Sequence, residues 1–360
     1  MSHDELIRDP VFQLNLLLWM AKEQPREDWR VRPLFWESGF AVLYVEQPFR
    51  FPVETTEAIQ SSGLEISVSP ESDLILARQR NGKALYFEAK ANSFGTASSD
   101  CQQARGHLLA AGPAFAETYE PLNACLLCYV LPSEGKSAMA KCLRQLAESL
   151  AVAKLAPGTY SVHGLSVNAG DLAYSWDEAL ADYLSLPGSE ATVLRELSDD
   201  TDPTPLLLVY TDEDCPNPKL RDFYRRAMLD RVRARLLCDL QAHEAGTPST
   251  ITLDDLLRRT TERVFEYLGR ERQNSLRRLV RAHLLVPICD RWRDRHPGRI
   301  SMADDTLTVR WTSASEEQEF LDWLEDRATV FPADKLPAEG PGLFDGIDAP
   351  QGQGSATKEE

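Results

Sequence analysis

The chain has 360 residues, of which 43% are hydrophobic and 26% charged, so its composition is that of a globular protein rather than a disordered or fibrous one. No apolar run reaches the ~18 residues that a membrane span needs, and the N-terminus lacks the charged, apolar and small segments of a signal peptide. Seven scattered cysteines, an odd number, fit a reduced cytoplasmic protein without a membrane partner better than a disulfide framework.

The formal net charge of −17 argues by itself against a nucleic-acid partner, but this charge is unevenly distributed. Residues 219–310 contain 20 Lys and Arg against 13 Asp and Glu, a net of +7, which leaves −24 for the rest of the chain. Asymmetry of this kind is a better guide to partners than the total charge. We therefore expect the C-terminal part to meet a polyanion that the rest repels.

The N-terminal half alternates between helix-like and strand-like patterns. Apolar spacing and turn residues predict, in chain order, a helix at 9–24, strands at 40–51 and 64–69, a hairpin within 69–95, a helix at 98–119 broken near Gly112-Pro113, a buried strand at 123–131, a helix at 137–155 and strands at 159–170 and 205–211. Helices and strands mixed in this way predict an α/β domain over 1–170, followed by a connector with further strands over 171–217.

After Pro218 the patterns are mainly helical and basic. They predict helices at 219–246, 252–269, 271–292 (disturbed at Pro287) and 315–328, and a hairpin at 298–311 that turns at Asp304-Asp305. Two or more helices followed by a hairpin are typical of a winged-helix domain, here expected over 218–330. A tail rich in Pro, Gly and Ala at 331–360 is expected to be disordered.

The third of these helices would be the DNA-recognition element. Its positive face is formed by Arg272, Arg277, Arg278 and Arg281. Arginine contacts to phosphates supply affinity that does not depend on sequence. The same spacing also fits an ordinary solvated helix face or a surface for another protein, and the acidic hairpin turn does not suit contact with a phosphate backbone.

The stretch "SPESDLILARQRNGKALYFEAKANSFG" (69–95) holds charged residues within an apolar hairpin. Asn81-Gly82 predicts a two-residue turn, because both of its central positions need positive φ. Paired residue numbers would then sum to 163, so Asp73 faces Lys90 and Glu88 faces Ile75. Since side chains alternate across a sheet, these four residues would share one face.

Two carboxylates on neighbouring strands suit Mg²⁺, a hard cation that prefers oxygen ligands. Asp73 and Glu88 are therefore expected to hold the metal, with the backbone carbonyl of Ala89 as a third ligand. Lys90 would lie beside the metal's water and stabilise developing charge. The alternative is a surface hairpin with a cross-strand ion pair between Asp73 and Lys90.

The segment Pro70-Glu71-Ser72-Asp73, separated by 14 residues from Glu88-Ala89-Lys90, resembles the motif of the PD-(D/E)XK nuclease superfamily. The resemblance covers roughly residues 1–170. It implies a restriction-endonuclease-like central mixed sheet flanked by helices, and cleavage of DNA with Mg²⁺ or Mn²⁺. It also implies a place in a bacterial defence, restriction or mobile-element system.

Some members of that superfamily carry a Gln followed four residues later by a Tyr on the next helix. Here Gln102 is followed by Gly106 and Gln103 by His107, and Gln102 is assigned the catalytic position. Many members add an acidic residue from the first helix. Glu37 is the best-placed candidate, with Glu23 and Glu5 behind it.

Alternative functions remain open from the sequence. The chain could be a catalytically inactive nuclease-like scaffold or DNA-binding subunit of an assembly, or its substrate could be RNA. The acidic surface outside the basic region suggests that a protein partner, or a second copy of the chain, helps to deliver the substrate.

Overall fold

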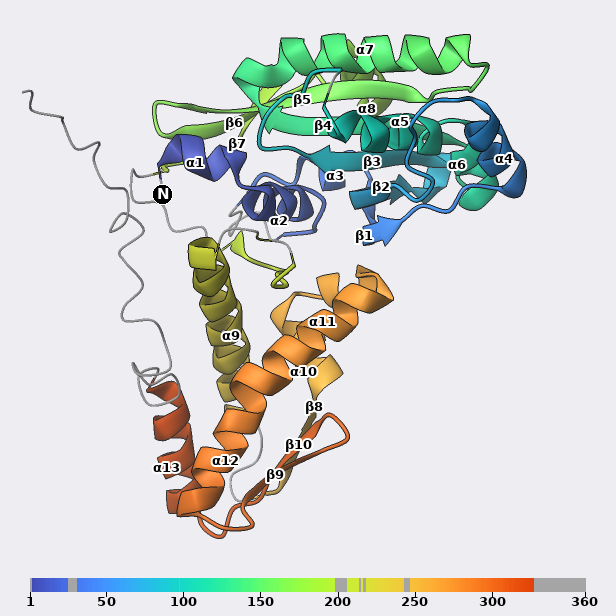
Figure 1. Ribbon diagram of the computed structural model, residues 1–360. Helices are drawn as coiled ribbons and strands as arrows, with labels where there is room; N and C mark the ends of the chain where they lie inside the picture. Colours follow the sequence, from blue (N-terminus) through green and yellow to red (C-terminus); the bar gives the residue numbers. More distant parts are fainter. Residues whose placement is uncertain are drawn as a thin grey trace, which may run out of the picture.

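The computed structural model describes residues 2–24, 31–96, 98–197, 206–213, 215, 218–242 and 247–326. It contains two lobes (Figure 1). The first is built on a seven-stranded mixed sheet with helices on both faces, and the second is mainly helical with a small three-stranded sheet. The expected α/β class is therefore confirmed. The expected tail at 331–360 lies outside the described residues.

The helices and strands of the first lobe are α1 (His3–Arg8), α2 (Pro10–Met20), α3 (Leu34–Glu37), β1 (Ala41–Pro48), α4 (Val53–Ser61), β2 (Glu71–Arg78), β3 (Lys83–Ala89), α5 (Asp100–Ala110), α6 (Pro113–Thr118), β4 (Ala124–Pro132), α7 (Lys136–Val152), β5 (Thr159–Asn168), β6 (Asp171–Ser175), α8 (Glu178–Leu184) and β7 (Glu190–Leu194). The strands lie side by side in chain order, β1 to β7. The pairs β3–β4 and β4–β5 are parallel, and the other pairs are antiparallel.

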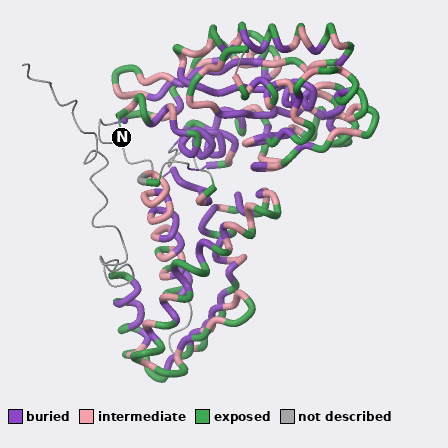
Figure 2. The backbone as a smooth tube through the Cα atoms, in the orientation of Figure 1, coloured by how far each residue is buried: buried purple, intermediate pink, exposed green. Residues whose placement is uncertain are grey.

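The sheet separates two apolar cores. Along β4, Leu126, Cys128 and Val130 pack on the face that α1 and α2 cover, whereas Leu127 and Tyr129 pack with α5 and α7 on the other face. Because both faces are covered, the strand reads as a continuous apolar run. Figure 2 shows the buried backbone running through this layer.

Two expected strands are absent. Residues 64–69 form no strand, and helix α4 precedes them instead. Residues 207–211 are also irregular: Asn15 on α2 accepts hydrogen bonds from the backbone N–H groups of Leu208 and Val209 at 2.7 and 3.0 Å. A buried side chain there replaces the sheet as the partner of the backbone. The strands β6 and β7, within the predicted connector, extend the main sheet.

The second lobe contains α9 (Pro218–Gln241), β8 (Ser249–Thr252), α10 (Leu253–Thr260), α11 (Arg270–Val280), α12 (Val286–Arg295), β9 (Ile300–Ala303), β10 (Thr306–Val309) and α13 (Ala314–Glu325). Its strands form an antiparallel sheet in the order β8-β10-β9. A π-helical segment, Arg281–Leu285, joins α11 to α12 and ends two residues before Pro287, whose missing N–H accounts for the predicted disturbance. The predicted hairpin turn is confirmed, with Asp304 and Asp305 both at positive φ.

The lobes are joined by direct contacts. Tyr224 on α9 donates a hydrogen bond to Asp9, the N-cap of α2. At the edge of the main sheet, Val45 on β1 forms a parallel bridge with Leu268, just before α11. Among the described residues, none of the helices combines the length and apolar character that a membrane crossing requires.

Candidate active site

The hairpin that carries Asp73 and Glu88 forms as expected, but its turn is longer. Residues Gln79–Asn81 make a 3₁₀ turn and Gly82 is left-handed, so Arg78 pairs with Lys83. Paired numbers sum to 161 from Arg78–Lys83 to Leu74–Phe87, and one further step in this register places Asp73 opposite Glu88. The predicted two-residue turn is wrong. Because the register differs by two residues, Asp73 and Glu88 still share a face of the sheet.

The two carboxylates lie at the end of the hairpin away from the turn. Asp73 Oδ2 accepts a hydrogen bond of 2.5 Å from the N–H of Ala89. The side chain of Glu88 is 4% exposed, and its Oε1 lies 2.8 Å from Lys90 Nζ. Its other oxygen, Oε2, is buried and has no hydrogen-bond partner among the described residues. A buried, unpartnered carboxylate oxygen is costly, so this arrangement calls for a cation.

Lys90 follows β3 directly and is fixed through its backbone. Its N–H donates to the carbonyl of Val130 on β4 at 2.8 Å, and its carbonyl accepts from Nε2 of the buried Gln13 at 3.1 Å. Nζ also lies 3.3 Å from the amide oxygen of Gln103 on α5. The amine is therefore held between Glu88 and Gln103, close to the carboxylate pair.

Helix α5 brings a second residue to the site. His107, one turn after Gln103, is fully buried, with Nε2 3.1 Å from the carbonyl of Glu71 and 3.8 Å from Glu88 Oε2. Its Nδ1 lies 3.1 Å from the hydroxyl of Tyr129. Burial lowers the pKa of His107 to about 3, so the ring is neutral. It positions the start of β2 rather than neutralising Glu88.

Burial also sets the protonation of the acids. It raises the pKa of Asp73 well above its ordinary value, and the nearby charge of Glu88 raises it further. It raises the pKa of Glu88 to about 7, although the charge of Lys90 opposes this. Burial lowers the pKa of Lys90, but Glu88 and Asp73 outweigh it, so the net pKa is raised and the amine is protonated.

The residues present fit a divalent cation. Asp73 and Glu88 supply oxygens, and Glu88 Oε2 has no other partner among the described residues to satisfy it. The N–H of Ala89 already donates to Asp73, so its carbonyl is the backbone group left to serve as the expected third ligand. The described residues contain no cluster of three or more His, Cys, Asp or Glu side chains placed for a metal. Mg²⁺ suits such a pair because it keeps several waters.

Two expected site residues lie elsewhere. Gln102 is exposed, and its carbonyl accepts from the N–H of Ser67. Its neighbour Gln103 occupies the place beside Lys90. Glu37 forms an exposed ion pair with Arg32 at 3.2 Å. It ends α3, whose following residue, Ser38, contacts Arg78 at the opposite end of β2, about 17 Å from Asp73 at 3.3 Å per residue.

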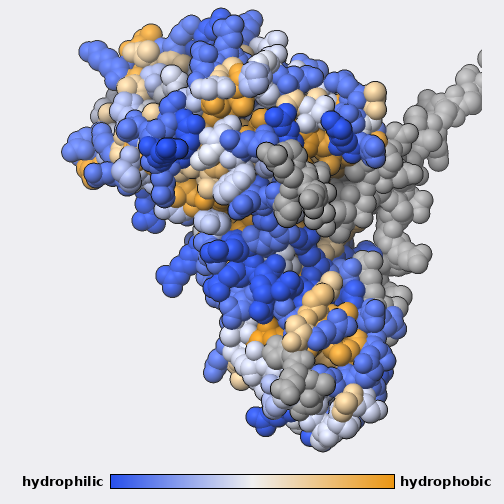
Figure 3. Space-filling model, turned by 180° about the vertical axis from the view of Figure 1, so that it is seen from behind, coloured by the Kyte–Doolittle hydropathy of each residue, from blue (hydrophilic) through white to orange (hydrophobic). Residues whose placement is uncertain are grey.

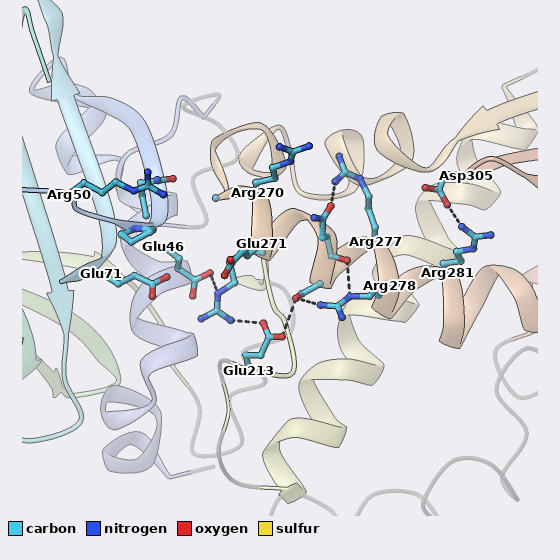
Figure 4. Close-up of a pocket in the computed structure, with 16 residues that line it drawn as sticks. Glu46, Arg50, Glu71, Glu213, Arg270, Glu271, Arg277, Arg278, Arg281 and Asp305 are labelled. Carbon is cyan, nitrogen blue, oxygen red and sulfur yellow. Dashed lines mark hydrogen bonds and ion pairs between the residues drawn. The ribbon is translucent and has the colours of Figure 1, made fainter. Parts of the chain in front are cut away.

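The four expected nucleic-acid contacts all line one cleft between the lobes (Figure 4). Three of them are ion-paired. Arg272 lies 3.2 Å from both Glu46 and Glu213, while Arg277 pairs with Asp254 and Arg281 with Asp305, each at 2.7 Å. Arg278 contacts the hydroxyl of Ser275 at 2.9 Å. Arg278 is therefore the one of these four arginines whose charge is not paired with a described carboxylate.

Sequence reasoning missed Gln103 and His107 as site residues. The sequence did contain a signal for this pair. Residues four apart lie on one face of a helix, and Gln103 is followed four residues later by the polar His107, whereas Gln102 is followed by Gly106. Gln13 and Glu71 carried no comparable signal. No family model, curated protein or solved structure matches the chain significantly.

Proposed function

We propose that the chain is a metal-dependent nuclease that hydrolyses the phosphodiester bonds of DNA. One observation carries the proposal: the half-buried carboxylate of Asp73 and the buried carboxylate of Glu88 meet the protonated amine of Lys90 at the ends of neighbouring strands, and one oxygen of Glu88 is unsatisfied among the described residues. Placing like charges in a buried site is unfavourable unless a cation binds there. Mg²⁺ and Mn²⁺ are the ions that this oxygen-rich pair fits.

Each residue has a role that its contacts support. A bound metal ion would lower the pKa of a water and neutralise phosphate charge. Lys90, held by Glu88 and Gln103, would donate a hydrogen bond to the phosphate oxygen on which charge develops. Gln13 and His107 keep the backbone of Lys90 and Glu71 in place, so that the ammonium group and the carboxylates stay aligned.

The arrangement of the chain supports the same proposal. The resemblance to the PD-(D/E)XK superfamily implies this placement of the acids and the lysine, and we propose that family and a bacterial defence, restriction or mobile-element role. The order α9-β8-α10-α11-α12-β9-β10, with strand order β8-β10-β9, supports a winged-helix lobe that binds DNA or a partner protein.

The test is cleavage by the purified full-length chain with Mg²⁺ or Mn²⁺, on supercoiled plasmid and on a single-stranded DNA circle. Asp73→Asn and Lys90→Met should each lower the rate at least a hundredfold, as should EDTA. Glu57→Gln, an exposed change on α4, is the matched control and should cut normally. Cleavage by both site variants at the wild-type rate would refute the proposal.

A non-catalytic scaffold is the second candidate. The ion pair between Lys90 and Glu88 favours it, because each charge partly satisfies the other without a metal. Such a protein would not cut either DNA with any divalent ion, and its stability would not respond to Mg²⁺. RNA as the substrate would appear in the same assay as cleavage of RNA but not of DNA.

A further inference from the structure

A cleft of about 1050 Å³ separates α11 from the edge of the main sheet (Figure 4). One wall is α11, which presents a row of arginines. The other wall is formed by the ends of β1 and β2 and carries Glu46, Arg50 and Glu71. Figure 3, seen from behind, shows hydrophilic side chains gathered where the lower lobe meets the upper one.

The exposed residues of α11 form a stripe along the cleft. Arg270, Asn274 and Arg278 are exposed and succeed each other at intervals of four, so they lie on one face of the helix. Arg270 and Arg278 form no ion pair with a described carboxylate, and neither does Arg50 on the facing wall. These three guanidinium groups are available to an anionic ligand, unlike the ion-paired arginines beside them.

The first turn of α11 is closed off by the sheet edge. Gly269, its N-cap, donates a hydrogen bond of 3.2 Å to the carbonyl of Val45, and Leu268 bridges to the same residue. Arg272 adds the ion pair to Glu46, at 3.2 Å. A helix enters a major groove only with a phosphate backbone on each side of it. Because the N-terminal end of α11 is hydrogen-bonded to β1, a duplex has no space to surround this end of the helix.

At Glu71 the cleft comes close to the candidate active site. Glu71 lines it and lies two residues before Asp73 on β2. At about 3.3 Å per residue, their Cα atoms are roughly 7 Å apart, and alternation puts both side chains on the same face. A chain of phosphates along the arginine stripe would therefore pass close to the carboxylate pair.

We propose that this cleft binds a single strand of nucleic acid through its phosphates, with Arg50, Arg270 and Arg278 as the contacts. Arg272 does not contact the strand; its ion pair with Glu46 fixes α11 against β1. Cleavage of the bound strand rests on the proposed function, whereas binding itself requires no cleavage. DNA and RNA strands share the phosphate chemistry, and the arms of the experiment separate them.

The experiment measures binding by fluorescence anisotropy, with the full-length chain in EDTA so that nothing is cut. The probes are labelled oligo-dT and oligo-rU of 20 nucleotides and a 20-base-pair duplex, from 50 to 200 mM salt. The double variant Arg270→Gln/Arg278→Gln is compared with Arg293→Gln/Arg295→Gln. The control removes two exposed arginines from α12, in the same continuous helix but outside the cleft.

We expect the single strands to bind more tightly than the duplex. The cleft double variant should bind about tenfold more weakly, and its salt slope should fall by about 1.4, since each phosphate contact with a single strand contributes about 0.7. The control should be unchanged. Glu271→Gln, which removes an exposed acid from the same wall, should tighten binding about threefold, an effect that misfolding cannot produce.

Equal binding by the two double variants, duplex binding as tight as single-strand binding, or no binding by the wild-type chain would each overturn this inference. The proposed function fails separately: if Asp73→Asn and the wild type bind oligo-dT equally but neither cuts any substrate, the cleft stands and the nuclease does not. If the Arg270→Gln/Arg278→Gln variant cuts DNA at the wild-type rate, the nuclease proposal stands and the cleft proposal fails.

Discussion

Glu88→Gln should make the metal-free protein more stable at alkaline pH. Burial raises the pKa of Glu88 from 4.5 to about 7, which corresponds to about 3 kcal/mol that the folded state loses when the group ionises. Gln mimics the neutral acid and avoids this loss. Its buried amide costs about 1 kcal/mol if it lacks a full set of partners. The net gain at pH 8.5 is therefore about 2 kcal/mol.

The sign is set by proton linkage. The folded pKa lies above the unfolded one, so the wild-type chain loses stability as pH rises from about 4.5 to about 7 and gains nothing further above that range. Urea unfolding in EDTA should show that the advantage of Glu88→Gln is about 2 kcal/mol larger at pH 8.5 than at pH 5. Glu57→Gln should show no such difference. An advantage that is equal at both pH values would refute the claim that Glu88 is a desolvated carboxylate.

Adding Mg²⁺ should reverse the order of stability. A ligand at 100 times its Kd stabilises the folded state by about 2.7 kcal/mol, so saturating Mg²⁺ should raise the wild-type midpoint at pH 8.5. Glu88→Gln, with one carboxylate fewer, should gain little. If both proteins respond equally, the metal binds elsewhere.

Three further predictions concern the surroundings of the site. Gln103→Ala should lower the cleavage rate roughly tenfold because its oxygen orients the amine, while the exposed Gln102→Ala should not; equal rates would contradict this assignment. Arg272→Gln should lower the free energy of unfolding by about 2 kcal/mol and speed proteolysis between the lobes, since Glu46 and Glu213 each lose an ion pair; unchanged proteolysis would show that Arg272 does not hold the lobes together. Gly106→Ala should destabilise the chain by about 1–3 kcal/mol, although alanine usually favours a helix, because a Cβ there would come 2.8 Å from a backbone oxygen of Ser67; a stabilised variant would show that α5 can shift.

The hairpin shows how far local sequence reasoning reaches. The Asn-Gly pair correctly predicts the position of the turn but not its type, because a contact with the neighbouring strand also affects the turn conformation. The carbonyl of Gly82 accepts from the N–H of Asn123, directly before β4, and this contact between distant segments favours the longer loop. The shared face of Asp73 and Glu88 survived because only an odd shift of register exchanges faces.

The additional acidic residue expected from the first helix and the glutamine depended on information that the sequence does not carry. Which face of α5 meets the sheet is set by its close packing at Gly106 and by the contact of Gln102 with Ser67, and both are tertiary. The position of Glu37 depends on where α3 docks along β2. Apolar periodicity identifies these helices, but it does not fix the end of the sheet at which they lie.

The uneven charge of the chain affects which parts of its surface can bind nucleic acid. A lobe with a large negative charge repels nucleic acid from most of its surface, and this repulsion weakens within about 8–10 Å at physiological salt. The arginines of α11 approach the acidic first lobe near Glu71, beside the carboxylate pair. In the proposed complex, attraction to the second lobe and repulsion from the first would together favour a phosphate chain that runs along α11 and passes Glu71, two residues from Asp73. The hydrogen bond from Gly269 to β1 fixes the position of α11 relative to the carboxylates. Loss of the ion pair between Arg272 and Glu46 would therefore change where the nucleic-acid strand is cut as well as how tightly it binds.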